Sequence, residues 1–122
     1  IIERATGPGP KAVKTSTRFE RDTEFSQAEL DSAAMGSNPG IYLGEWHSHL
    51  VASPTPSPRD VLSMQEIAES ANYATDCPVM VICGFDQKAA AVAEIKAWAF
   101  RVSSSMRQVT IKGTAGEKSN PC

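Results

Sequence analysis

The sequence is poor in the patterns that define several large classes of protein. Its three cysteines, an odd number without close pairing, do not suggest the disulfide framework of a small secreted domain. No apolar run approaches the roughly 18 residues that span a membrane, and no signal peptide is visible. No dense Lys/Arg run occurs, and the net charge is −2, which disfavours nucleic-acid and anionic-membrane partners. We therefore expect a cytoplasmic protein that binds neither.

What the chain does contain is ordinary for one globular domain. Of its 122 residues, 41% are apolar and 21% are charged, enough to bury a core without disulfides or metal. We expect a single domain over residues 1–122. Because the chain opens on Ile1 and runs at once as a strand, we expect this domain to begin upstream of Ile1. The polar end, about 112–122, is expected to be loose.

Turn and capping residues divide the chain into strands and helices. The predicted strands are residues 1–5, 11–20 (a strand or an extended segment), 41–49, 77–85, 91–102 and an edge strand in RQVTI at 107–111. The segment 91–102 also fits a helix, but the short DQK turn before it favours a hairpin. One predicted helix covers 26–35, with Ser26 as N-cap, Glu29 three residues on in a capping-box pattern, and Gly36 as C-cap. A second predicted helix runs from Ser57 to about Ser70.

Both histidines of the chain lie one residue apart, in the segment GEWHSHLVASPTPSPRD at 44–60. On the predicted strand, His47 and His49 point to the same side with Cα atoms about 6.6 Å apart. Their imidazoles could therefore converge on one metal ion, whereas a lone histidine on an apolar face is usually a core residue. The strand is partly apolar on both sides, so we expect both faces to be covered, with Trp46 in the core.

The helix that follows begins with residues that can cap it or act in a site. Ser57 suits the N-cap and Asp60 the N3 position, where its charge favours the helix dipole. Asp60 also shares a helix face with Met64, Ile67 and Ala71, which should face the core. A carboxylate there is costly unless it is paired, capping or bound to a cation. Asp60 is therefore either a capping acid or a third metal ligand.

A set of His47, His49 and Asp60 would leave one coordination position open. Catalytic zinc uses three protein ligands and a water, whose pKa it lowers to about 7. Ser57 would lie one helical turn away, with a hydroxyl able to donate to a developing oxyanion. A structural zinc site is the weaker interpretation, because such sites close with four protein ligands, often cysteines. Cys83 lies in an apolar run and is expected to be a small buried hydrophobe.

The pattern His47-Ser48-His49, seven residues, Ser57, two residues, Asp60 resembles without a gap the signature of the JAMM (JAB/MPN+) zinc metalloproteases. The stretches ERATGPGPKA (3–12), RFERD (18–22) and YLGEWHSH (42–49) resemble the bacterial JAB subfamily, and the likeness covers roughly residues 1–100. It implies an α/β fold, a mixed curved sheet flanked by helices, similar to that of cytidine deaminases. It also implies cleavage of amide or isopeptide bonds at the C-terminus of a ubiquitin-like modifier.

The resemblance implies that His47, His49 and Asp60 bind Zn²⁺ and that Ser57 helps to hold the oxyanion. It implies a ubiquitin-like conjugate as substrate and E1- and E2-like proteins as partners. The family usually has proline where this chain has Leu50.

The general base of the family is a glutamate in an E-x-G-G-like stretch, which this chain lacks. The resemblance puts that glutamate upstream of Ile1. Within the chain Glu3 is the first substitute, and Glu45, on the histidine side of the strand, ranks below it. A chain without this base could instead be a non-catalytic MPN-like binding or scaffold module, although such scaffolds usually lack the histidines. Of the other candidates, Trp98 and Phe100 are expected in the core and Arg59 on the solvated surface.

Overall fold

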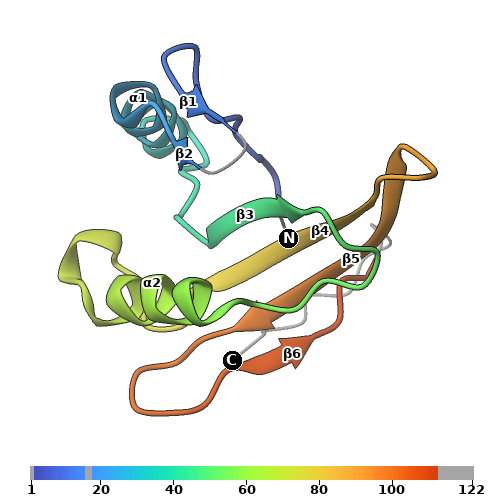
Figure 1. Ribbon diagram of the computed structural model, residues 1–122. Helices are drawn as coiled ribbons and strands as arrows, with labels where there is room; N and C mark the ends of the chain where they lie inside the picture. Colours follow the sequence, from blue (N-terminus) through green and yellow to red (C-terminus); the bar gives the residue numbers. More distant parts are fainter. Residues whose placement is uncertain (1, 16–17, 113–122) are drawn as a thin grey trace. The chain divides into compact units, whose positions relative to one another are not determined.

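The structure, a computed structural model, describes residues 2–15 and 18–112 (Figure 1). The chain divides into two compact units, Ile1–Tyr42 and Leu43–Cys122. The single domain over 1–122 and its beginning upstream of Ile1 stay predictions. The predicted loose tail lies outside the described residues, apart from Lys112.

The first unit holds a short hairpin and one helix. Strands β1 (Val13–Lys14) and β2 (Phe19–Glu20) pair antiparallel, so the predicted segment 11–20 folds back on itself as two short strands. The prediction of a strand at 1–5 is wrong for residues 2–5, which form no strand. A strand needs a partner for its backbone groups, and no described strand pairs with this segment.

Helix α1 (Thr23–Ala34) begins earlier than predicted, and its caps differ from those expected. Asp22, not Ser26, is the N-cap: its carboxylate accepts hydrogen bonds from the backbone N–H of Phe25 and of Lys11, both at 3.1 Å. These charge-assisted bonds stabilise a helix start at Asp22. Gly36 is not the C-cap either, because the helix ends on Met35 in a right-handed conformation.

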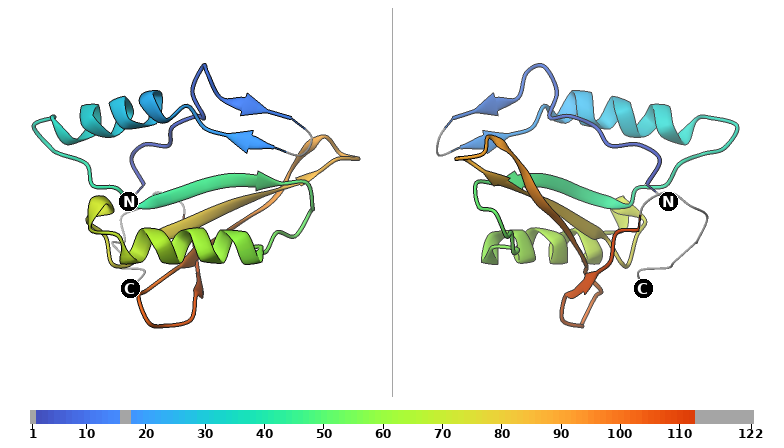
Figure 2. Two further views of the ribbon diagram at one scale, coloured as in Figure 1. Left: turned by 60° about the vertical axis from the view of Figure 1, so that its left-hand side comes forward. Right: turned by 90° about the vertical axis from the view of Figure 1, so that its right-hand side faces the viewer.

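The second unit is built on a four-stranded mixed sheet, as the α/β prediction required (Figures 1 and 2). Its strands, in spatial order, are β3 (Gly44–His49), β4 (Val79–Asp86), β5 (Ala91–Ala99) and β6 (Arg107–Val109). Strand β3 is parallel to β4, and the other pairs are antiparallel. Helix α2 (Pro58–Glu69) and the 3₁₀ helix η1 (Ala71–Tyr73) connect β3 to β4.

The hairpin prediction for 91–102 is confirmed, as is the edge strand within 107–111. The carboxylate of Asp86 closes the β4–β5 turn by accepting from the backbone N–H of Lys88 and Ala89, at 2.8 and 3.2 Å. The apolar run at 77–85 becomes β4, as expected. Cys83 in this run is half-buried, not fully buried, because its side chain alternates away from the strand face that α2 covers.

The core of the second unit lies between α2 and the sheet. Buried apolar side chains on this side come from α2, from β4 and from β5 with the residue after it: Met64, Ile67, Ala68, Met80, Ile82, Trp98 and Phe100. Val79, Ala97 and Ala99 are buried too, but strand alternation points them to the opposite face of the sheet. The predicted burial of Trp98 and Phe100 is thus confirmed. Ala71 is exposed, against the prediction, because α2 ends at Glu69 and Ala71 belongs to η1.

The prediction that strand 41–49 is covered on both faces is wrong. The strand begins only at Gly44, and the side chain of Trp46 is 47% exposed, so Trp46 is not a core residue. Neighbouring side chains of a strand point to opposite faces, and within its own unit β3 has α2 only on the histidine face. Among the described residues, no helix has the length and apolar character that crossing a membrane requires.

Candidate metal centre

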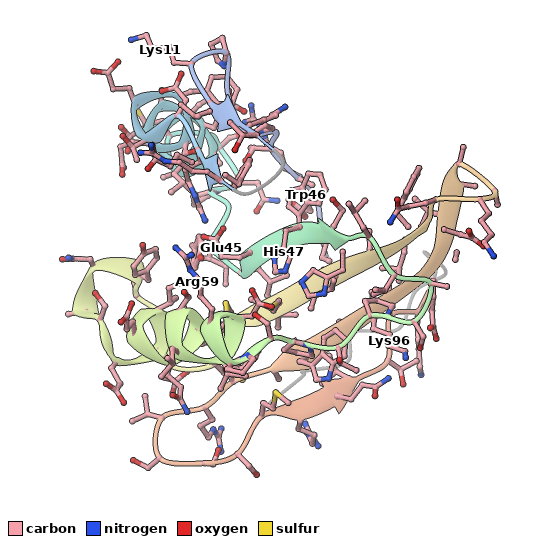
Figure 3. The ribbon with its side chains drawn as sticks, viewed as in Figure 1. Lys11, Glu45, Trp46, His47, Arg59 and Lys96 are labelled. Atoms are coloured by element: carbon pink, nitrogen blue, oxygen red, sulfur yellow. The ribbon has the colours of Figure 1, made fainter. Side chains whose placement is uncertain are left out.

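The two histidines reach the same side of the sheet through the alternation of β3. In the parallel register, His47 lies beside Ile82 and His49 beside Gly84 of β4. Ile82 is fully buried beneath α2, so the face that carries both imidazoles is the face that the helix covers. Figure 3 shows His47 directed from β3 towards the start of α2.

Ser57 is the N-cap of α2 and Asp60 its N3 residue, as predicted, and the structure shows that the two form a reciprocal capping box. The backbone N–H of Ser57 donates to Asp60 Oδ2 at 2.7 Å, and the backbone N–H of Asp60 donates to Ser57 Oγ at 3.2 Å. The box fixes the Asp60 carboxylate in the first helical turn, where the helix dipole favours a negative charge.

The structure brings the three predicted side chains together. The two Nε2 atoms of His47 and His49 are 2.9 Å apart. Asp60 Oδ1 is 3.5 Å from His47 Nε2, and Asp60 Oδ2 is 3.4 Å from His49 Nε2. Atoms bound tetrahedrally at about 2.0–2.1 Å from a zinc ion lie about 3.3 Å from one another. The three ligand atoms, all within 4.8 Å of one another, are therefore spaced as a metal site requires.

The electrostatics of the group favour the protonation states that bind metal. Burial lowers the pKa of His47 below its ordinary 6.5; the nearby Asp60 carboxylate opposes this, while His49 adds to it. Burial opposes ionisation of Asp60, but the hydrogen bonds from Ser57 and the two imidazoles outweigh it and hold the pKa of Asp60 below 3.8. The result is a neutral imidazole beside a carboxylate at neutral pH, the forms in which both can be ligands.

The group is accessible from one side. The side chains of His47, His49 and Asp60 are 29%, 24% and 17% exposed, which leaves room for a further ligand or a substrate. Arg59 is exposed on the first turn of α2, as predicted, and Glu45 precedes the histidines on the same face of β3 (Figure 3). Glu3 is exposed and belongs to the first unit, so its predicted role stays a prediction.

Sequence reasoning missed the residues that hold the loop between β3 and α2. Lys96 Nζ donates to Ser53 Oγ at 2.8 Å, and Gln87 Nε2 donates to the carbonyl of Leu50 at 3.3 Å. One signal was available: alternation along 91–102 puts Lys96 on the same face as Trp98. A lysine on the same strand face as a buried tryptophan is partly removed from water and needs a polar partner. The sequence does not tell which residue that partner is.

Two curated relatives match the chain. A protein of Enterobacter hormaechei named CD-NTase/cGAS isopeptidase is 49% identical over 86 residues, which are 70% of this chain and 46% of that protein. A protein of Sinorhizobium fredii named "Probable metalloprotease y4qB" is 31% identical over 87 residues, 69% of this chain and 53% of that protein. The chain thus spans about half the length of these relatives.

No solved structure matches the chain. The family described as prokaryotic homologs of the JAB domain, Prok-JAB, matches residues 3–101. That match includes the capped helix start, the paired histidines and most of both units. The chain therefore belongs to the prokaryotic JAB-domain family.

Proposed function

We propose that this chain is a zinc-dependent isopeptidase or peptidase that cleaves the amide or isopeptide bond at the C-terminus of a ubiquitin-like modifier. The observation that carries the proposal is the convergence of two imidazoles and one carboxylate, with ligand atoms within 4.8 Å of one another. The names of the two relatives, an isopeptidase and a metalloprotease, support the same reaction class.

His47, His49 and Asp60 would hold the metal. Two nitrogen ligands and one carboxylate oxygen form a donor set typical of catalytic zinc, and their side chains leave one side of the group accessible. Bound there, zinc supplies a Lewis acid for the scissile carbonyl and lowers the pKa of a water molecule to about 7.

Ser57 has a second role besides capping in this proposal. Its Oγ accepts the backbone N–H of Asp60, and its own O–H, which interacts with the Asp60 carboxylate, would turn from that carboxylate to the substrate. Such a hydroxyl can donate to the oxyanion that develops when the carbonyl is attacked, while the cap stays intact. The rigid helix start holds this donor close to the metal ligand Asp60, since the two residues share the capping box.

A glutamate would carry the proton from the attacking water to the leaving amine. Glu3 is the candidate within the chain; it is exposed and belongs to the first unit. Proton transfer of this kind contributes about 10²–10⁴-fold to a rate. Glu3→Gln should lower kcat by that factor without loss of zinc; unchanged kcat would exclude Glu3 and direct the search for the base to other glutamates.

The class of substrate follows from the same proposal. The name of the 49% identical relative makes a CD-NTase conjugate the first substrate to test. A conjugate of this kind implies E1- and E2-like proteins, which form the bond that this chain would cleave. A ubiquitin-like protein with a fluorogenic amide at its C-terminus is the simpler second probe.

The test has two readouts, bound zinc and cleavage. The purified chain should bind one zinc ion, its melting temperature should rise on zinc addition, and it should cleave the conjugate in a chelator-sensitive reaction. His47→Ala should abolish all three effects. Ser48→Ala is the matched control, because Ser48 lies between the histidines but points to the opposite face of β3.

Two results would contradict the proposal in different ways. Absence of zinc binding at neutral pH would reject the metalloenzyme. Zinc binding without cleavage of either probe would favour the binding or scaffold module instead.

A further inference from the structure

The segment of residues 50–57, here called the connecting loop, makes a long excursion between β3 and α2. It leaves the end of β3, crosses β4 towards β5 and returns to the start of the helix (Figure 1). Its contact with β4 is close: a Cβ on Gly84 would lie 2.6 Å from Pro54 Cδ and 2.7 Å from the carbonyl oxygens of Val51 and Ala52. Pro54 is among the most deeply buried side chains. The loop is thus packed onto the sheet, not extended into solvent.

Lys96, on β5, binds the connecting loop at Ser53. In the sheet register, His47 lies beside Ile82, and Ile82 lies beside Lys96, so Lys96 is on the histidine face, two strands or about 9–10 Å away. Its ammonium donates to Ser53 Oγ at 2.8 Å and lies 3.3 Å from Glu94 Oε2. The side chain is only 19% exposed. Figure 3 shows Lys96 beside the connecting loop.

We propose that Lys96 is a positioning residue: by holding Ser53 it fixes the connecting loop, and through the loop it sets the place of Ser57 and Asp60 opposite the two histidines. Its effect on catalysis rests on the function proposed above, whereas its effect on the loop does not.

The prolines of the connecting loop explain how a hydrogen bond at Ser53 can constrain the backbone position of Ser57. Pro54 and Pro56 lie between them and Pro58 follows; each proline fixes one backbone dihedral, so a tie at Ser53 constrains the residues after it. The ammonium is also costly to bury unless it is paired. Glu94 partly neutralises it, and Ser53 Oγ accepts a hydrogen bond from one of its three N–H groups. The second tie, from Gln87 to Leu50, is between neutral groups and lies at the other end of the loop.

Amide exchange of the metal-free chain, followed by NMR, tests the loop without any substrate. The probe is the Ser57 N–H, which is protected by its bond to Asp60 Oδ2. Lys96→Met keeps the alkyl stem and removes the charged donor; it should speed exchange at Ser57 about tenfold and leave the amides of β4 unchanged. Ser53→Ala removes the other partner of the same bond and should have a similar effect. Lys88→Met is the matched control, at an exposed turn position.

Because Lys96→Met and Ser53→Ala remove the two partners of one hydrogen bond, they can be combined in a double-mutant cycle. The double variant of Lys96→Met and Ser53→Ala should exchange no faster at Ser57 than either single variant, because one interaction is lost only once. Lys96→Arg, which keeps a charged donor, should restore most of the protection. Unchanged exchange at Ser57 in both single variants, or full additivity in the double variant, would overturn the proposal. Should Lys96→Met fail to fold, Ser53→Ala, at an exposed residue, decides the question.

Turnover separates this inference from the proposed function. In an active enzyme, Lys96→Met should lower kcat about tenfold at unchanged KM, with its melting temperature close to that of the parent chain. If the chain neither binds zinc nor cleaves a conjugate, the proposed function fails while the exchange result stands. If cleavage occurs and Lys96→Met leaves kcat unchanged, the positioning role fails while the function stands.

Discussion

The two α-helices of this protein begin in similar ways and have different consequences. Each has 12 residues, an acidic residue in the first turn and a polar N-cap. At α1 the acid that caps is Asp22 itself, which is 7% exposed and accepts two backbone N–H groups. At α2 the N-cap is Ser57, whose Oγ accepts the backbone N–H of Asp60. The carboxylate of Asp60, at position N3, accepts the backbone N–H of Ser57 in turn.

The difference lies in what the carboxylate faces after capping. Both oxygens of Asp22 are taken by backbone donors of its own unit. Both oxygens of Asp60 lie within 3.5 Å of an imidazole nitrogen, although one also accepts from Ser57. Helix α1 buries none of its residues, whereas α2 buries Met64, Ile67 and Ala68 against the sheet. A capping acid thus becomes a candidate ligand only when packing holds its helix against a strand that carries suitable partners.

The largest expected effect is on metal affinity, and it should distinguish the two acids. Asp60→Asn keeps an oxygen that can accept from Ser57, so the cap survives, but it removes the charge from the proposed site. We expect zinc affinity to fall at least about 100-fold, since loss of groups that only support ligands already costs 10–100-fold. Competition with a chelating dye measures it. Asp22→Asn is the control and should bind zinc as the parent chain does; equal losses in both variants would refute the comparison.

The second largest effect is expected at Ser57, where one substitution distinguishes the capping role from a role in catalysis. Ser57→Gly should cost only a few tenths of a kcal/mol of stability, because glycine is a tolerated N-cap. Without the hydroxyl, kcat should fall by about 10²–10³-fold. Steady-state cleavage of a conjugate and chemical denaturation of the same preparation measure the two quantities. Parallel, modest losses in both would assign Ser57 a structural role alone.

Most of the candidate site was predictable because it is local in sequence. The capped helix start at Ser57 follows from the residue types and from their spacing to the next apolar positions. The common face of His47 and His49 follows from strand alternation alone. The spacing between these two elements adds the resemblance to the family, which the match over residues 3–101 confirms.

What the sequence could not predict depends on contacts that are distant along the chain. The motif at Ser26 and Glu29 reads as a capping box as well as the one at Ser57, yet the helix begins at Asp22, where Lys11 supplies an additional donor. Trp46 is exposed because burial depends on what covers a face and not on the residue type. Lys96 and Ser53 are 43 residues apart, and no local pattern connects them.

Acid should separate the contribution of His47 to the stability of the metal-free chain from the contributions of Asp60 and Asp22, because they are lost at different pH. The folded-state pKa of His47 is lowered from 6.5, so between that value and its folded pKa the unfolded chain binds more protons and stability falls as pH falls. The pKa values of Asp60 and Asp22 are also lowered by folding, so they too make stability fall as pH falls, but only below 3.8. Urea denaturation of chelated protein should therefore show a loss below about pH 6.5 that His47→Gln removes, and a later loss that remains. Stability that is flat down to about pH 4 would contradict the assignment to His47.

The smallest effect concerns the capping box that does not form. Ser26 lies inside α1, where its N–H already donates to the carbonyl of Asp22 at 3.0 Å. Ser26→Ala should therefore stabilise the helix slightly, by about 0.5 kcal/mol, since alanine has the higher helix propensity. Ser63→Ala, at an exposed interior position of α2, should give a gain of the same sign. Were Ser26 the cap, the same change would instead cost about 1 kcal/mol. The sign of the shift in the denaturation midpoint is thus enough to decide which residue begins α1.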